Sequence, residues 1–298
     1  MEECMKRTLL AIMAITCILM APAFSCDERG QTGIVEDNDL WIGQDVKSAS
    51  TIDEAAFNKI IDDIGKIYSP MVAKKGGKLT FIRNWSDGTV NAYASRKGNI
   101  FNVAMYGGLA RHDAITPDGF ALVVCHELGH HIGGIPKKRS FFGTTWASTE
   151  GQADYFGNLK CLRNYMEGDD NIKIIGLMKI PADVKTMCNK QFADANDSAI
   201  CQRGSMAGLS LANLFASLRK FTQDKFPAFD KLDRKIVSKT NPNHPAPQCR
   251  LDTYFAGSIC EIDKATDVSD KDEDAGVCSR KLGIKIGTRP FCWFKPKA

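Results

Sequence analysis

The sequence predicts an α+β fold, mainly helical, with a small antiparallel β-sheet packed against one central helix. Three observations predict it. Apolar residues recur at helical spacing over several long segments, three short strand-like runs follow the first of these, and a later helical segment carries the pattern His-Glu-x-x-His. The 298 residues are 44% hydrophobic and 25% charged, which is an ordinary composition for a folded protein.

The amino-terminal residues have the pattern of a bacterial secretory signal. Basic residues 6–7 precede an apolar run over residues 8–20, which is shorter than the roughly 20 residues needed to span a bilayer. Two processing routes remain open: cleavage after Ala-Pro-Ala at residues 21–23, or lipid attachment at Cys26. We therefore expect a signal peptide over residues 1–25 and an exported protein of the bacterial periplasm or cell envelope, anchored to a membrane if Cys26 is lipidated.

The remaining chain divides into three expected parts. Residues 26–50 are expected to form a linker, residues 51–260 one folded domain, and residues 261–298 a cysteine-containing tail packed on that domain. The formal net charge of +4 is too small to indicate a nucleic-acid partner.

The cysteine count favours an oxidising compartment. Of 11 cysteines, Cys4 and Cys17 lie in the signal and nine remain. If Cys26 carries lipid, the other eight can form four disulfides, but eight cysteines allow 105 connectivities and we predict none of them. The eight are Cys125, Cys161, Cys188, Cys201, Cys249, Cys260, Cys278 and Cys292. They contain no CxxC pair, which argues against a structural zinc ribbon.

Local signals predict the first helix and the sheet. Ser50 and Thr51 can cap a helix whose apolar positions recur at helical spacing to Ile67. Turn sequences then separate three strand-like runs, which we expect to pair as an antiparallel meander. The runs are residues 78–83, 89–95 and 99–105.

Local signals also predict the central helix. Thr116 is an N-cap followed by proline at the first helical position, and the apolar segment ends at Gly133 and Gly134. A second helix is expected from about Ala147 to Met166, and a further one over residues 205–221.

Residues 126–130 (His-Glu-Leu-Gly-His) place two metal-binding side chains on this central helix. His126 and His130 are four residues apart and so lie on one face, while Glu127 borders the space beside them. Zinc prefers nitrogen donors of this kind and, in hydrolases, keeps one position for water. His131 and Cys125 are rotated away, so we expect His131 to pack or hydrogen-bond locally and Cys125 to lie in the core or in a disulfide.

A third ligand is needed, and Glu150 is the best candidate. The alternative pattern, in which x-x-Gly-x-x-His follows the second histidine, is excluded because its last position is Pro136. Glu150 and Asp154 lie four residues apart on one face of the second helix. Glu150 can complete the metal shell, and Asp154 can accept the second N–H of a ligating histidine.

The chain resembles the gluzincin family of HtpX, BepA, Oma and the CaaX prenyl endopeptidases over roughly residues 51–252. Five blocks carry the resemblance, in chain order: residues 91–94 (Asn-Ala-Tyr-Ala), 107–109 (Gly-Gly-Leu), 124–130, 150–154 (Glu-Gly-Gln-Ala-Asp), and His244-Pro245 with Arg250. The resemblance implies a zincin-type fold with Asn91 on the active-site edge strand. It also implies that His244 and Arg250 approach the metal from a later loop, where they stabilise the transition state or gate the site. Membrane helices and a helical-repeat tail, found in members of that family, are not predicted here.

Taken together, these features lead us to expect that residues 51–260 form a zinc metallopeptidase domain, an endopeptidase with one zinc ion per chain and Glu127 as the general base. Its expected partners are extended, unfolded or misassembled envelope polypeptides, which would add as a strand beside residues 89–95. Two alternatives remain: a zinc-bound chaperone or binding module without turnover, and a disulfide-stapled structural protein in which the motif is accidental.

Overall fold

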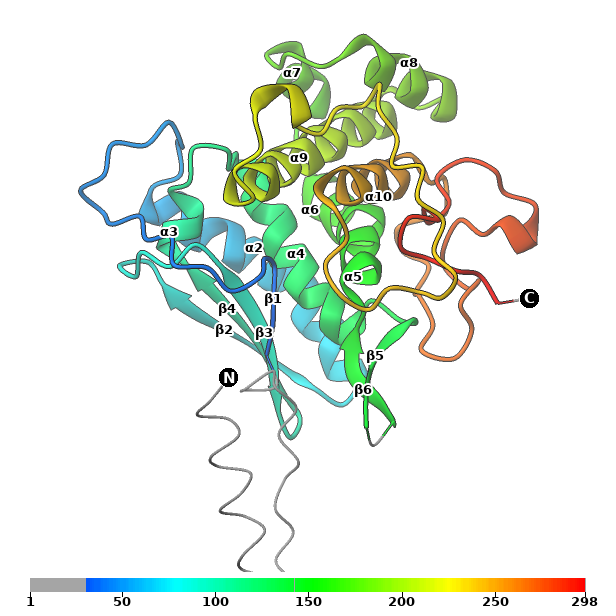
Figure 1. Cartoon of the computed structure of the whole chain (residues 1–298), viewed down its shortest axis with the longest axis horizontal. Helices are drawn as coiled ribbons and strands as arrows, with labels where there is room; N and C mark the ends of the chain where they lie inside the picture. The colour runs from blue at the N-terminus through cyan, green and yellow to red at the C-terminus, as the bar shows by residue number, and fades with distance from the viewer. Residues whose placement is uncertain (1–30, 142, 298) are drawn as a thin grey trace, which may run out of the picture.

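The computed structural model describes residues 31–141 and 143–297. Its architecture is α+β, as predicted: a small sheet lies on one side of the central helix α4, and helices cover the other side (Figure 1). The expected signal peptide and Cys26 lie outside the described residues. Within the described part of the chain, no helix is long and apolar enough to cross a membrane.

The main sheet has the strand order β1-β3-β4-β2. Strands β3 (Ala92–Lys97) and β4 (Ile100–Tyr106) form the expected antiparallel hairpin. The expectation of an antiparallel meander is wrong for β2 (Lys78–Asn84), because β2 pairs in parallel with β4 and the sheet is therefore mixed.

The cause is the connection from β2 to β3, which passes to the far side of β4 instead of making a tight turn. Arg111 donates to the carbonyls of Trp85 and Asp87 at 2.9 and 3.2 Å, and so satisfies backbone groups that no strand pairs. Gly107 and Gly108 let the next turn, α3 (Gly107–Ala110), approach closely. A Cβ atom at Gly108 would lie 1.9 Å from the Gly88 carbonyl.

Strand β1 (Gln31–Gly33) pairs antiparallel with β3, with Gly33 opposite Tyr93. Strand β3, which was expected to be an edge strand, is therefore covered by a segment of the predicted linker. Sequence patterns could not reveal this, because three residues carry too little periodicity to predict a strand.

Helix α4 (Pro117–Ile132) forms as predicted. The Thr116 side chain accepts a hydrogen bond from Gly119 N at 3.1 Å, and Gly133 ends the helix. Every residue from Gly119 to Ile132 is buried. Helix α2 (Glu54–Lys74) also forms, but its cap is Asp53, since the hydroxyl of Ser50 donates instead to the Ala110 carbonyl.

The second predicted helix is continuous but not regular: α5 (Glu150–Phe156) runs through a π-helical segment, η1 (Gly157–Leu162), into α6 (Arg163–Met166). Helix α9 begins ten residues before the expected start. The remaining elements are β5 (Lys137–Ser140), β6 (Gly143–Ser148), α7 (Asn171–Gly176), α8 (Ala182–Gln191), α9 (Ala195–Leu218), η2 (Gln223–Lys225), α10 (Pro247–Ile259) and η3 (Arg280–Leu282).

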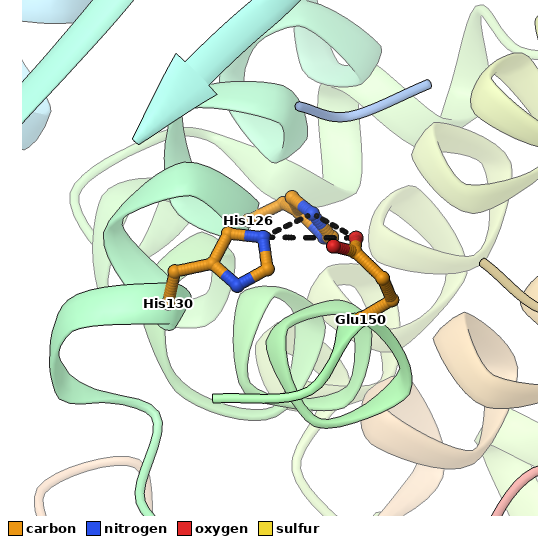
Figure 2. Close-up of side chains that lie close together, drawn as sticks. All are labelled: His126, His130 and Glu150. Carbon is orange, nitrogen blue, oxygen red and sulfur yellow. Dashed lines mark hydrogen bonds and ion pairs between the residues drawn. The ribbon is translucent and has the colours of Figure 1, made fainter. Parts of the chain in front are cut away.

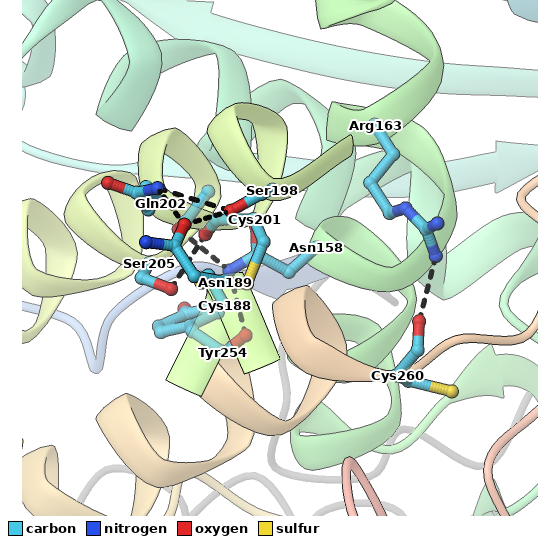
Figure 3. Close-up of a disulfide and its surroundings, with 11 residues drawn as sticks. Asn158, Arg163, Cys188, Asn189, Ser198, Cys201, Gln202, Ser205, Tyr254 and Cys260 are labelled. Carbon is cyan, nitrogen blue, oxygen red and sulfur yellow. Dashed lines mark hydrogen bonds between the residues drawn. A yellow bond between two sulfur atoms is a disulfide. The ribbon is translucent and has the colours of Figure 1, made fainter. Parts of the chain in front are cut away.

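Four disulfides join the eight cysteines, as the cysteine count allowed. The pairs are Cys125–Cys161, Cys188–Cys201, Cys249–Cys292 and Cys260–Cys278. The first ties α4 to η1. The second ties α8 to α9, and beside it Asn189 accepts hydrogen bonds from Ser198 and Gln202 (Figure 3). The last two hold the carboxy-terminal segment on α10, and they place the fully buried Trp293 against Gly151.

Candidate metal centre

His126, His130 and Glu150 meet in one buried cluster that could hold a metal ion (Figure 2). The Nε2 atoms of the two histidines lie 3.1 Å apart. Glu150 Oε2 lies 3.2 Å from the first of these atoms and 3.6 Å from the second. Helix α4 supplies both imidazoles and the first turn of α5 supplies the carboxylate, so the predicted ligand set converges.

The outer nitrogens of both imidazoles already have acceptors. Nδ1 of His126 lies 2.8 Å from Asp154 Oδ1, and Nδ1 of His130 lies 2.8 Å from the Ser148 carbonyl oxygen. Each of these acceptors favours a proton on Nδ1, which leaves the Nε2 lone pairs pointing at one another. Two facing lone pairs beside a buried carboxylate require a cation between them, either a proton or a metal ion.

The electrostatics of the metal-free chain agree with this requirement. Burial alone would lower the pKa of His126, but the carboxylates of Asp154, Glu150 and Glu127 together outweigh burial and raise this pKa to about 9. Burial lowers the pKa of His130 well below its usual range. One imidazole therefore holds a proton while the other presents a free lone pair.

Glu150 is turned toward the cluster by basic groups on both sides. Lys138 on β5 lies 2.7 Å from Oε1, and His244 Nε2 lies 3.3 Å from Oε2. Burial would raise the pKa of Glu150, but His244, His130 and Lys138 outweigh it and hold this pKa well below its usual range. The carboxylate is thus ionised, as a metal ligand must be.

Glu127 is fully buried, and neither of its carboxylate oxygens has a hydrogen-bond partner among the described residues. Burial raises its pKa well above the usual range for a glutamate. A buried carboxyl group without partners costs free energy, so its position next to the cluster calls for a functional explanation.

Asp154 links the cluster to α10. It accepts hydrogen bonds from Arg250 Nε and Nη2 at 2.8 and 2.7 Å, and from the Tyr254 hydroxyl at 2.6 Å. Burial would raise the pKa of Asp154, but Arg250 and His126 lower it to about 2. Asp154 therefore connects Arg250 to His126.

Asn91 is not part of the cluster. Its buried side chain pairs with the backbone of Val35, accepting from Val35 N at 3.3 Å and donating to Val35 O at 3.2 Å. The resemblance also suggested two later residues. His244 lies at the cluster, beside Glu150, and Arg250 contacts it through Asp154.

The two neighbours that were expected to turn away do so. Cys125 is in a disulfide. The His131 ring stacks between Phe101 and Trp146, with centroids 5.0 and 4.8 Å away, and its Nε2 lies 3.0 Å from the Asn102 carbonyl oxygen. His131 thus fixes α4 against the sheet and the β5–β6 hairpin.

A second group of potential ligands, Asp233 with Cys249 and Cys292, does not make a metal site, because the two sulfurs are joined in a disulfide.

Sequence reasoning missed Lys138 and the segment from Gly33 to Val35. Lys138 lies in a run of three basic residues that resembles a solvated loop. Only the fold of the β5–β6 hairpin brings its amine back to Glu150.

No protein-family model, curated protein or solved structure matches the chain.

Proposed function

We propose that this protein is a zinc-dependent endopeptidase of the gluzincin type. The proposed metal ligands are His126, His130 and Glu150, and the proposed general base is Glu127. The order of motifs along the chain supports the family assignment, and two imidazoles with one carboxylate are a common ligand set of catalytic zinc.

One observation carries the metal assignment: two imidazoles have their Nδ1 atoms engaged and their Nε2 atoms 3.1 Å apart, beside an ionised carboxylate. Hydrogen-bonded outer nitrogens are the usual support of ligating histidines. When bound, zinc supplies Lewis acidity, which polarises a carbonyl group and makes water acidic enough to lose a proton near neutral pH.

The buried Glu127 carboxylate accepts that proton and then delivers it to the departing amine nitrogen. Burial raises the pKa of Glu127, which makes its carboxylate a stronger base in the first step and lets it hold the proton until the second. His244 Nε2 lies 3.3 Å from Glu150 Oε2 and so borders the cluster. Its proposed role is to donate a hydrogen bond to the oxygen that becomes negative during the reaction, a contribution typically worth a few kcal/mol.

The proposed substrates are extended or misfolded polypeptides of the cell envelope. Four disulfides fit an oxidising, exported environment. The rival function, a zinc-bound chaperone or binding module, needs the ligands but has no use for Glu127. The Glu127 carboxylate is buried and has no hydrogen-bond partner among the described residues, which favours the catalytic function.

The test is metal content measured alongside cleavage of reduced casein. We expect about one zinc per chain and activity that a chelator removes. Replacement of His126, His130 or Glu150 by alanine should abolish both. Glu127→Gln should keep the zinc and lose about 10²- to 10⁴-fold in rate.

The matched control is Glu167→Gln, the same change at a largely exposed glutamate. A Glu127→Gln variant as fast as its parent would show that the mechanism is wrong. A parent chain that binds zinc and cleaves no unfolded polypeptide would favour the binding module.

A further inference from the structure

The chain's own residues 31–35 lie where the proposed substrate strand would bind. Strand β1 runs antiparallel to β3, and the pairing continues beyond it because Ile34 N donates to the Ala92 carbonyl at 3.1 Å. Val35 follows, held at both backbone polar atoms by the side chain of Asn91.

Three polar side chains bind this segment through its main chain, one residue after another. His244 Nε2 lies 2.8 Å from the Gly33 carbonyl oxygen, Arg250 Nη1 donates to the Ile34 carbonyl at 2.6 Å, and Asn91 pairs with Val35. The same His244 nitrogen lies 3.3 Å from Glu150 Oε2. The Gly33 carbonyl, and with it the Gly33–Ile34 peptide bond, therefore lies next to the metal cluster.

The side-chain positions differ along the segment. A Cβ atom at Gly33 would lie 3.0 Å from the Tyr93 ring and 3.1 Å from Asn91 Oδ1, which leaves room only for a small residue. Ile34 is fully buried and Val35 is 6% exposed, so both following positions accept aliphatic side chains. Val35 also borders a cavity of about 110 Å³, together with His244, Arg250 and Phe215.

We propose that the Gly33–Ile34 bond is a substrate of this site and that the protein cleaves itself there. This inference rests on the proposed peptidase function and deepens it: the preferred substrates have a small residue before the cleaved bond and two branched aliphatic residues after it. Hydrolysis adds the oxygen of one water to the Gly33 carbonyl carbon and breaks the bond to Ile34 N. The products are a carboxylate at Gly33 and an amino group at Ile34.

The experiment compares intact masses of the wild type and Glu127→Gln, both secreted into an oxidising compartment, purified with a chelator and then supplied with zinc. The wild type should convert to a chain that begins at Ile34, whereas Glu127→Gln should keep the bond. Gly33→Val should slow the cleavage at least 10-fold. Gly43→Val is its matched control, because the nearest heavy atom to a Cβ there is 4.0 Å away.

A second measurement is independent of activity. In the intact Glu127→Gln chain, the amides of Ile34 and Val35 should exchange hydrogen slowly. Ile34 N donates to the Ala92 carbonyl, and Val35 N donates to Asn91 Oδ1. Exchange as fast as in an unstructured peptide would contradict the placement.

The outcomes separate the two proposals. A wild type that cleaves casein but keeps the bond intact overturns self-cleavage and leaves the peptidase function standing. Cleavage at the same bond in Glu127→Gln also overturns self-cleavage, because another protease must then be responsible. A wild type that cleaves neither itself nor casein contradicts both proposals.

Discussion

Asp154 accepts two hydrogen bonds from Arg250, one at each carboxylate oxygen. One of these oxygens, Oδ1, also lies 2.8 Å from Nδ1 of His126. A buried arginine on α10 therefore fixes the carboxylate that orients an imidazole of the candidate metal cluster on α4.

Replacing Asp154 with asparagine should test this orientation. The amide keeps the shape but loses the charge that both Arg250 and His126 require, so zinc affinity or activity should fall about 10- to 100-fold. Zinc affinity is measured by competition with a coloured chelator. Asp230→Asn, at an exposed position, is the control. Unchanged affinity and turnover in Asp154→Asn would show that this carboxylate has no part in the site.

Lys138 compensates the buried charge of Glu150 from the side away from the histidines. Lys138→Met should destabilise the metal-free protein by about 2 kcal/mol, because hydrogen bonds to charged groups contribute that much and the glutamate loses its partner. Lys138→Arg should restore most of the loss. Chemical unfolding followed by circular dichroism measures the stability of each variant. Equal stability of the wild type, Lys138→Met and Lys138→Arg would show that Lys138 does not compensate the charge of Glu150.

The Cys125–Cys161 disulfide joins α4, which carries His126 and His130, to the π-helical segment η1. Replacing both cysteines with serine should reduce stability by about 2 to 4 kcal/mol and should also weaken zinc binding, because α4 is released on one side. The Cys188–Cys201 pair is the control, since it joins α8 to α9 away from the cluster. Loss of that pair should lower the stability and leave zinc affinity unchanged; equal effects on zinc affinity would refute the distinction.

His131 predicts a pH dependence. Burial lowers its pKa to about 3, against about 6.5 in the unfolded chain. As the pH falls, His131 takes up a proton in the unfolded state before it does so in the folded state. The stability that the neutral, buried His131 contributes is therefore fully present above pH 6.5. It is lost as the pH falls toward 3, by about 1.4 kcal/mol per pH unit. In metal-free protein, His131→Phe should remove this slope. Parallel stability curves for the variant and the wild type between pH 6.5 and 4.5 would contradict the prediction.

Cys26 remains the candidate for a lipid anchor, on the pattern of residues 23–26 and because the other eight cysteines are all paired. Mass spectrometry of the amino terminus decides this, and Glu127→Gln is the protein to use because self-cleavage would remove Cys26 from the wild type. We expect a lipidated Cys26. An unmodified chain that begins at Phe24 would rule the anchor out.

The amino-acid sequence was enough to predict the central helix with its caps, the position of His126 and His130 on one face of it, and the position of Glu150 and Asp154 on one face of the next helix. These features depend on helical periodicity and on capping residues within a few positions of one another, so local chemistry suffices. It also predicted the β3–β4 hairpin and the capacity for four disulfides.

The folded chain alone shows the strand order, the disulfide pairing, the position of Lys138 and the place of residues 31–35 beside β3. Each depends on contacts between distant residues: Gly33 and His244 are 211 positions apart, and Ile34 and Arg250 are 216 apart. A strand of three residues has no detectable period, and hydrogen bonds to its main chain leave no mark on its side chains. The position of β1 beside β3 is set by the shape and the polar groups of the folded domain.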